Sequence, residues 1–199
     1  MTVGLLQRLP QAPPSAPGRD GKRRVVITVD VEASPSRQRA RHVDRLIWGR
    51  FGEREVGIGR MMDIADAYGV ALTFFVDYCE SARYPGEFER ITAEIVRRGH
   101  DAQIHAHQLQ LPDDFFANHG LTPAPRTLED YDEPHARVLV EHLVQRAREC
   151  GATPVAFRGG AFEFNANILD AMRAQGLQLS FNYNVARTSS PASYENLSV

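Results

Sequence analysis

The sequence predicts an α/β protein in which parallel strands alternate with helices. A continuous β-branched run at residues 25–29 is typical of a strand in a parallel sheet, and later segments carry apolar residues at three- and four-residue steps. Strand–helix–strand units of this kind are joined by right-handed crossovers. Either an open α/β sheet or a (β/α) barrel fits this pattern, and 199 residues suffice for one sizeable domain or for part of a larger barrel.

Local signals define each expected element. The first strand, residues 23–32, is expected to be buried on both faces of the sheet. The first helix, residues 57–68, ends at Gly69, which suits a helix C-terminal cap. Further strands are expected over 70–76, 101–105, 155–157 and 177–183, and further helices over 86–98, 134–150 and 165–175. Segments 33–52 and 108–133 are expected to be loops, and residues 1–22 a flexible N-terminal segment before a domain spanning 23–199.

Composition narrows the class of function. A formal net charge of -2 argues against a nucleic-acid partner, and no apolar run approaches the ~20 residues of a membrane span. Cys79 and Cys150 are too few for a disulfide framework, so both are expected to be reduced. The N-terminal segment has no apolar stretch typical of a secretory signal, which favours a cytoplasmic location. The oligomeric state is left open.

Candidate functional side chains cluster where the predicted strands end. In parallel α/β folds, active sites lie at the carboxyl edge of the sheet. Asp30 and Glu32 follow the first strand, His105 and His107 follow the third, and Arg158 follows the fourth. Residues two apart in a strand share one side, so the two imidazoles can reach a common metal ion. A pair of this spacing also occurs on exposed strands without metal, and the neighbouring His100 is interpreted as structural.

Four segments, in this order along the chain, resemble the motifs of the polysaccharide deacetylases, the NodB-like carbohydrate esterases. They are TVDVE at 28–32, GIG at 57–59 with ALTFFV at 71–76, RGHD at 98–101, and FRGGAF at 157–162. The ALTFFV strand is the most specific of these matches, and the resemblance covers residues 24–183. It implies a (β/α) barrel of the deacetylase type, incomplete at the C-terminus because five strands are recognised where roughly eight are expected.

The resemblance also implies a role for each candidate residue. Asp30 corresponds to the general base that takes a proton from a metal-activated water, and Arg158 to the cation that pairs with it. Glu32 and His105 correspond to metal ligands, with zinc as the favoured divalent metal. The implied activity is hydrolysis of an acetyl group from an N- or O-acetylated carbohydrate, either a small molecule or an oligosaccharide.

The chain departs from the family pattern in three places. Leu109 stands where the second metal-binding histidine is usual, and His107 is the candidate substitute. Ser180 lies near the position of a motif aspartate, and no Leu-His pair supplies a general acid. Two alternatives therefore stay open. One is another His-x-His metal-dependent (β/α)-barrel hydrolase, of the amidohydrolase or phosphoesterase kind, and the other is a non-catalytic deacetylase-like binding protein.

Overall fold

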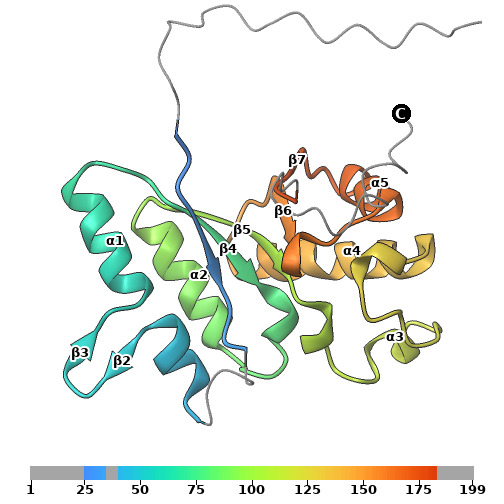
Figure 1. Ribbon diagram of the computed structural model, residues 1–199, viewed down its shortest axis with the longest axis horizontal. Coiled ribbons are helices and arrows are strands. Elements are labelled where there is room, and N and C mark those ends of the chain that lie inside the picture. Colours follow the sequence, from blue (N-terminus) through green and yellow to red (C-terminus); the bar gives the residue numbers. More distant parts are fainter. Residues whose placement is uncertain (1–24, 35–39, 183–199) are drawn as a thin grey trace, which may run out of the picture.

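The main sheet has five parallel strands that follow the order of the chain. The computed structural model describes residues 25–34 and 40–182, so the predicted flexible segment 1–22 lies outside the described residues. The strands are arranged in the order β1 (Thr28–Val31), β4 (Thr73–Asp77), β5 (Asp101–Ala106), β6 (Ala156–Gly159) and β7 (Leu179–Ser180) (Figure 1). A doubly wound sheet reverses this order at a switch point. The uninterrupted order is that of a (β/α) barrel, as predicted.

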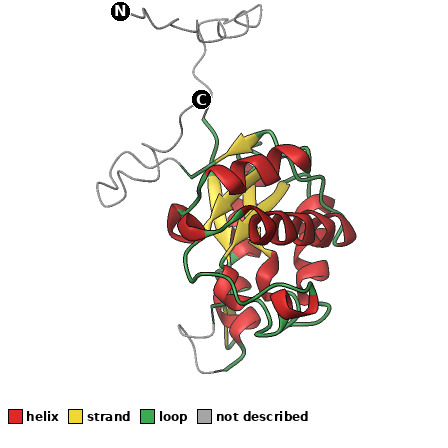
Figure 2. Ribbon diagram, turned by 90° about the vertical axis from the view of Figure 1, so that its right-hand side faces the viewer, coloured by secondary structure: helices red, strands yellow, loops and turns green. Residues whose placement is uncertain are grey.

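Helices connect the strands and cover the sheet (Figure 2). They are α1 (Ile58–Ala67), α2 (Glu87–Arg97), α3 (Phe115–Asn118), α4 (Glu133–Glu149) and α5 (Ala166–Ala174). Figure 1 shows α1 and α2 beside the β1–β4 side of the sheet, whereas α4 and α5 pack together beside β6 and β7. The four long helices that the sequence predicts are thus confirmed, and each of their ends lies within one residue of the prediction. None of the helices in the described part of the chain is long and apolar enough to span a membrane.

The core lies between the central strands and these helices. Phe74 of β4 and Ile104 of β5 are fully buried, together with Ile91 of α2 and Leu139 of α4. β4 is buried on both faces, since Phe74 and Phe75 point to opposite sides and are both fully buried. The prediction of burial on both faces is wrong for the first strand, because residues 25–27 precede β1 and remain exposed, with Val25 at 83%, and within β1 only Val31 is buried. In the described structure β1 is an edge strand with a neighbour on one side only.

The two predicted loops contain more structure than expected. Segment 33–52 includes a π-helical turn, Val43–Ile47, and the first strand of a small antiparallel hairpin between β2 (Arg50–Phe51) and β3 (Arg54–Glu55). Segment 108–133 includes α3, whose Phe115 and Phe116 are buried in the core. Neither segment shows the apolar periodicity of a long element, which explains why sequence patterns missed them.

Candidate metal centre

Three side chains from two strand ends meet at the carboxyl edge of the sheet. One potential ligand atom from each of Glu32, His105 and His107 lies within 4.8 Å of the other two. Glu32 directly follows β1, His105 lies within β5, and His107 directly follows β5. Because β4 lies between these two strands, the contact joins side chains across one intervening strand. The structure therefore brings together all three residues that the sequence proposed as metal ligands.

His105 is held in a defined tautomer. Its side chain is buried, and Nδ1 donates a hydrogen bond to the carbonyl oxygen of Arg158 at 2.8 Å. A histidine whose Nδ1 donates to a carbonyl presents the lone pair of Nε2 to a metal. Burial lowers the pKa of His105 and outweighs the opposite effect of the Asp30 carboxylate. The neutral imidazole, which is the form that binds metal, is thus the favoured state.

His107 contacts the glutamate directly. Its Nε2 lies 2.8 Å from Oε2 of Glu32, and its ring meets the ring of His105 edge-on, with the centroids 4.8 Å apart. The hydrogen bond to Glu32 raises the pKa of His107, against the opposing effect of burial. The ring packs against Gly160, where a Cβ atom would lie 2.4 Å from Nδ1 of His107. Glycine at position 160 therefore leaves the space that the imidazole occupies.

This donor set fits a zinc ion. Two imidazole nitrogens and one carboxylate oxygen form one of the common ligand sets of catalytic zinc, in which a fourth position stays open for water or substrate. The hydrogen-bonded tautomer of His105 supplies the outer contact that such a ligand needs. Glu32 and His107, whose side chains are 12% and 34% exposed, leave the group reachable from solvent. The residues present thus match the metal that the family resemblance implies.

Asp30 and Arg158 form an ion pair beside the three potential ligands. Nη1 of Arg158 lies 2.5 Å from Oδ1 of Asp30, and Nη2 donates to Oγ1 of Thr28 at 3.0 Å. Their strands are three positions apart in the sheet, which is roughly 14 Å in a flat arrangement. The side chain of Arg158 reaches Asp30 over the ring of Phe75, and its guanidinium carbon lies 4.2 Å from the ring centroid. Both side chains therefore project from the same face of a curved sheet.

Sequence reasoning missed two acids at the end of β4. Asp77 and Glu80 are fully buried, and Asp77 lies opposite His105 in the register of β4 and β5. Burial, reinforced by the charge of Glu80, raises the pKa of Asp77 to about 8. Burial likewise raises the pKa of Glu80. The available signal was the same one that identified Asp30 and Glu32, namely carboxylates at the end of a buried strand.

Other residues considered in the sequence lie elsewhere or have structural roles. His100 is buried, and its Nδ1 accepts a hydrogen bond from the backbone N–H of Leu72, so its structural interpretation is confirmed. Leu109, at the position of the usual second histidine, is 57% exposed. Phe162 lies near Arg158, with the guanidinium carbon 5.8 Å from its ring centroid. It is the last residue of the FRGGAF segment, so this motif places an aromatic ring next to the candidate site.

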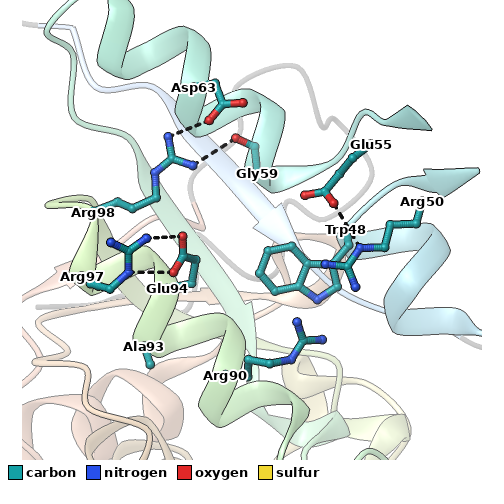
Figure 3. A pocket seen from close by; sticks show the side chains of 10 residues that line it. All are labelled: Trp48, Arg50, Glu55, Gly59, Asp63, Arg90, Ala93, Glu94, Arg97 and Arg98. Atoms are coloured by element: carbon teal, nitrogen blue, oxygen red, sulfur yellow. Dashed lines mark hydrogen bonds and ion pairs between the residues drawn. The ribbon is translucent and has the colours of Figure 1, made fainter. Parts of the chain in front are cut away.

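A cavity of about 520 Å³ lies between α1, α2 and the small hairpin, and none of its lining residues belongs to the metal centre (Figure 3). The buried Trp48 forms part of its wall, with the guanidinium groups of Arg50 and Arg90 over the indole ring at 5.3 and 4.7 Å. All four arginines that line the cavity form ion pairs with acidic side chains. Because these charges are already neutralised, the cavity has no excess of positive charge to attract an anion.

The comparisons with known proteins found matches among solved structures and none among protein families or curated sequences. A putative polysaccharide deacetylase from Mycobacterium smegmatis is 21% identical, with a TM-score of 0.55 over 78% of this chain and 49% of that chain. A family 4 carbohydrate esterase from Streptomyces lividans is 14% identical, with a TM-score of 0.47 over 78% and 60% of the two chains.

A third similar structure is a peptidoglycan N-acetylglucosamine deacetylase, 16% identical, with a TM-score of 0.46 over 78% of this chain and 54% of that chain. The chain spans about half the length of the Mycobacterium smegmatis structure. The Mycobacterium smegmatis structure carries the name of the family whose motifs the sequence resembles. The chain therefore has the fold of the polysaccharide deacetylases.

Proposed function

We propose that the protein is a metal-dependent hydrolase that removes acetyl groups from an N- or O-acetylated carbohydrate. The observation that carries this proposal is the position of Asp30, paired with Arg158, beside the potential ligands Glu32, His105 and His107. All five lie at the carboxyl edge of a parallel sheet, where active sites of such folds are found. The fold shared with a putative polysaccharide deacetylase supports the substrate class.

The chemistry follows from the residues. When bound, a divalent metal lowers the pKa of water and polarises the acetyl carbonyl, and the two-nitrogen, one-oxygen donor set favours zinc. Asp30 acts as the general base and takes the proton of the attacking water. Arg158 orients the Asp30 carboxylate through the 2.5 Å contact, and Thr28 fixes the second guanidinium nitrogen. His105 would bind the metal through its neutral imidazole, and His107, whose Nε2 contacts Glu32, would give up a proton on binding.

The substrate we favour is a glycan precursor in the cytoplasm. Both cysteines, Cys79 and Cys150, are buried and free, as expected for a protein kept in a reducing compartment. Burial raises the pKa of each thiol, which keeps them protonated and unreactive. Neither cysteine belongs to the potential ligand group. The cysteines thus support a reducing environment and have no part in the proposed chemistry.

The test combines metal analysis with acetate release. The full chain is purified, its zinc, cobalt and nickel content is measured, and acetate is assayed after incubation with N-acetylglucosamine oligomers and O-acetylated sugars. We expect one metal ion per chain and acetate release that chelation abolishes. Asp30→Asn should reduce release by about 10²- to 10⁴-fold with the metal still bound. A chain that binds no stoichiometric metal would refute the proposal, and loss of metal in Asp30→Asn would show that Asp30 is a ligand instead.

A further inference from the structure

Two of the three potential metal ligands lie just beyond the strands that carry them. β1 ends at Val31, one residue before Glu32, and β5 ends at Ala106, one residue before His107. The hydrogen bonds of the sheet therefore fix the backbone of His105 but not that of the other two ligands. A ligand must be held within about 0.5 Å of its productive position to bind metal tightly. Another interaction has to orient these two segments.

Glu80 contacts the first of these segments. Its side chain is fully buried, and Oε2 accepts a hydrogen bond from the backbone N–H of Ala33 at 2.6 Å. Ala33 immediately follows Glu32, so this bond fixes the peptide that carries the glutamate ligand. Ala33 is itself fully buried, which excludes water as a competing acceptor.

Asp77 contacts the second segment. Its side chain is fully buried, and Oδ1 accepts hydrogen bonds from the backbone N–H of His107 at 3.2 Å and of Cys79 at 3.1 Å. The bond to Cys79 closes the turn Tyr78–Glu80 and therefore connects Asp77 to the segment that carries Glu80. The end of β4, which lies between β1 and β5, thus reaches both neighbouring strand ends.

We propose that Asp77 and Glu80 are positioning residues for the metal centre, with Glu80 orienting the Glu32 segment and Asp77 orienting the His107 segment. The inference rests on the proposed metal centre, since neither acid belongs to the ligand group itself. In effect, the two side chains extend the hydrogen bonding of the sheet beyond its last paired residues, Val31 in β1 and Ala106 in β5. Outer contacts of this kind set the geometry and affinity of metal ligands.

The cost of burying these acids supports a specific role. A carboxylate without water is unfavourable unless its oxygens are hydrogen-bonded. Among the described residues, Oδ2 of Asp77 and Oε1 of Glu80 are buried without a hydrogen-bond partner. An apolar pair would pack at this place without that penalty. Each acid instead uses one oxygen for the backbone next to a ligand, which is what a positioning role requires.

Matched substitutions separate the reach of the acceptor oxygen from the carboxyl group that carries it. Glu80→Gln and Asp77→Asn keep an acceptor oxygen at the same reach and replace the carboxyl group by an amide. Glu80→Asp and Asp77→Glu, the altered-reach variants, keep the carboxyl group and change the reach. Cobalt(II) titration of the full chain, followed by the visible absorption of the bound ion, measures both affinity and ligand geometry. We expect the dissociation constant to rise about 10- to 100-fold in the altered-reach variants, with a changed cobalt spectrum, and to stay near wild type in the amide variants.

Asn165→Ala is the control for loss of stability. Its side chain caps α5 and accepts from the N–H of Ile168, away from both ligand segments, so the variant should lose stability and keep wild-type cobalt affinity. Equal weakening in the amide and altered-reach variants would overturn the inference, because the carboxyl group itself and not the reach of its oxygen would then be the cause. Wild-type affinity in all four variants would overturn it as well. Absence of cobalt binding by the wild-type chain would refute the proposed function instead.

Discussion

His105 and Arg158 lie opposite each other on β5 and β6, and the imidazole of His105 donates to the main-chain carbonyl of Arg158 at 2.8 Å. The side chain of the same arginine holds Asp30. One position in β6 thus orients a potential metal ligand through its backbone and the proposed general base through its side chain. Because the two contacts use different atoms, substitution of the side chain can separate them.

Arg158→Lys should lower the rate of acetate release without removing the metal. Lysine keeps the positive charge but lacks the planar fork that contacts both Asp30 and Thr28. The carboxylate loses its fixed orientation, and we expect kcat/KM to fall by about 100-fold, the effect of a small misplacement of a reacting group. Steady-state kinetics and metal content check this. The backbone carbonyl is unchanged, so a variant that loses its metal would contradict the separation of the two contacts.

Gly160→Ala should weaken metal binding. The added Cβ would lie 2.4 Å from Nδ1 of His107, so the imidazole has to move. We expect the zinc dissociation constant to rise about tenfold or more, as for other disturbances of ligand orientation, measured by competition with a chromogenic chelator. Gly59→Ala is the matched control, because its Cβ would meet only the flexible end of the Glu55 side chain. Unchanged affinity in Gly160→Ala would indicate that His107 is not a ligand.

Zinc should stabilise the folded protein through His105. A ligand that binds only the native state adds RT ln(1 + [L]/Kd), or about 2.7 kcal/mol at a hundredfold excess over Kd. Thermal unfolding with and without zinc should therefore show a higher Tm for the wild type, reversed by a chelator. His105→Ala removes the buried imidazole of the group and should abolish the shift. An equal shift in that variant would place the zinc elsewhere.

His135 should make stability depend on pH. Burial lowers its pKa, but hydrogen bonds to the carbonyl of Thr122 and the carboxylate of Asp132 outweigh this effect and raise it. A raised pKa in the folded state adds stability below the ordinary value of about 6.5, and this is lost as pH rises through the folded-state pKa. Denaturant unfolding with chelator present should show a smaller decrease above pH 6.5 in His135→Gln than in the wild type.

His142 provides the opposite sign as a control. Burial lowers its pKa, with a further contribution from Arg146, so the neutral form is favoured in the folded state. Its contribution to stability is present above about pH 6.5 and is lost as pH falls through the lowered folded-state pKa. His142→Gln should therefore reduce the loss of stability below pH 6.5 and leave the decrease above pH 6.5 unaffected. If His142→Gln also reduced the decrease in stability above pH 6.5, that decrease could not be assigned to His135.

Local patterns in the sequence were sufficient to predict the long helices and to identify one set of candidate functional residues. Apolar periodicity predicted α1, α2, α4 and α5, because each of these helices buries one face against the sheet. Asp30, Glu32, His105 and His107 stood out because each lies at the end of a predicted strand, where polar groups of a parallel fold collect. The resemblance to the deacetylases then supplied their expected roles.

Only the tertiary structure decided which of these side chains meet. The contact between Glu32 and His107, and the reach of Arg158 over Phe75 to Asp30, depend on strand order and on the curvature of the sheet. The same is true of Asp77 and Glu80, whose role depends on backbone groups 30 and 47 residues away along the chain. Sequence periodicity records which way a side chain faces within its own element, whereas distances between strand ends are set by how the strands pack.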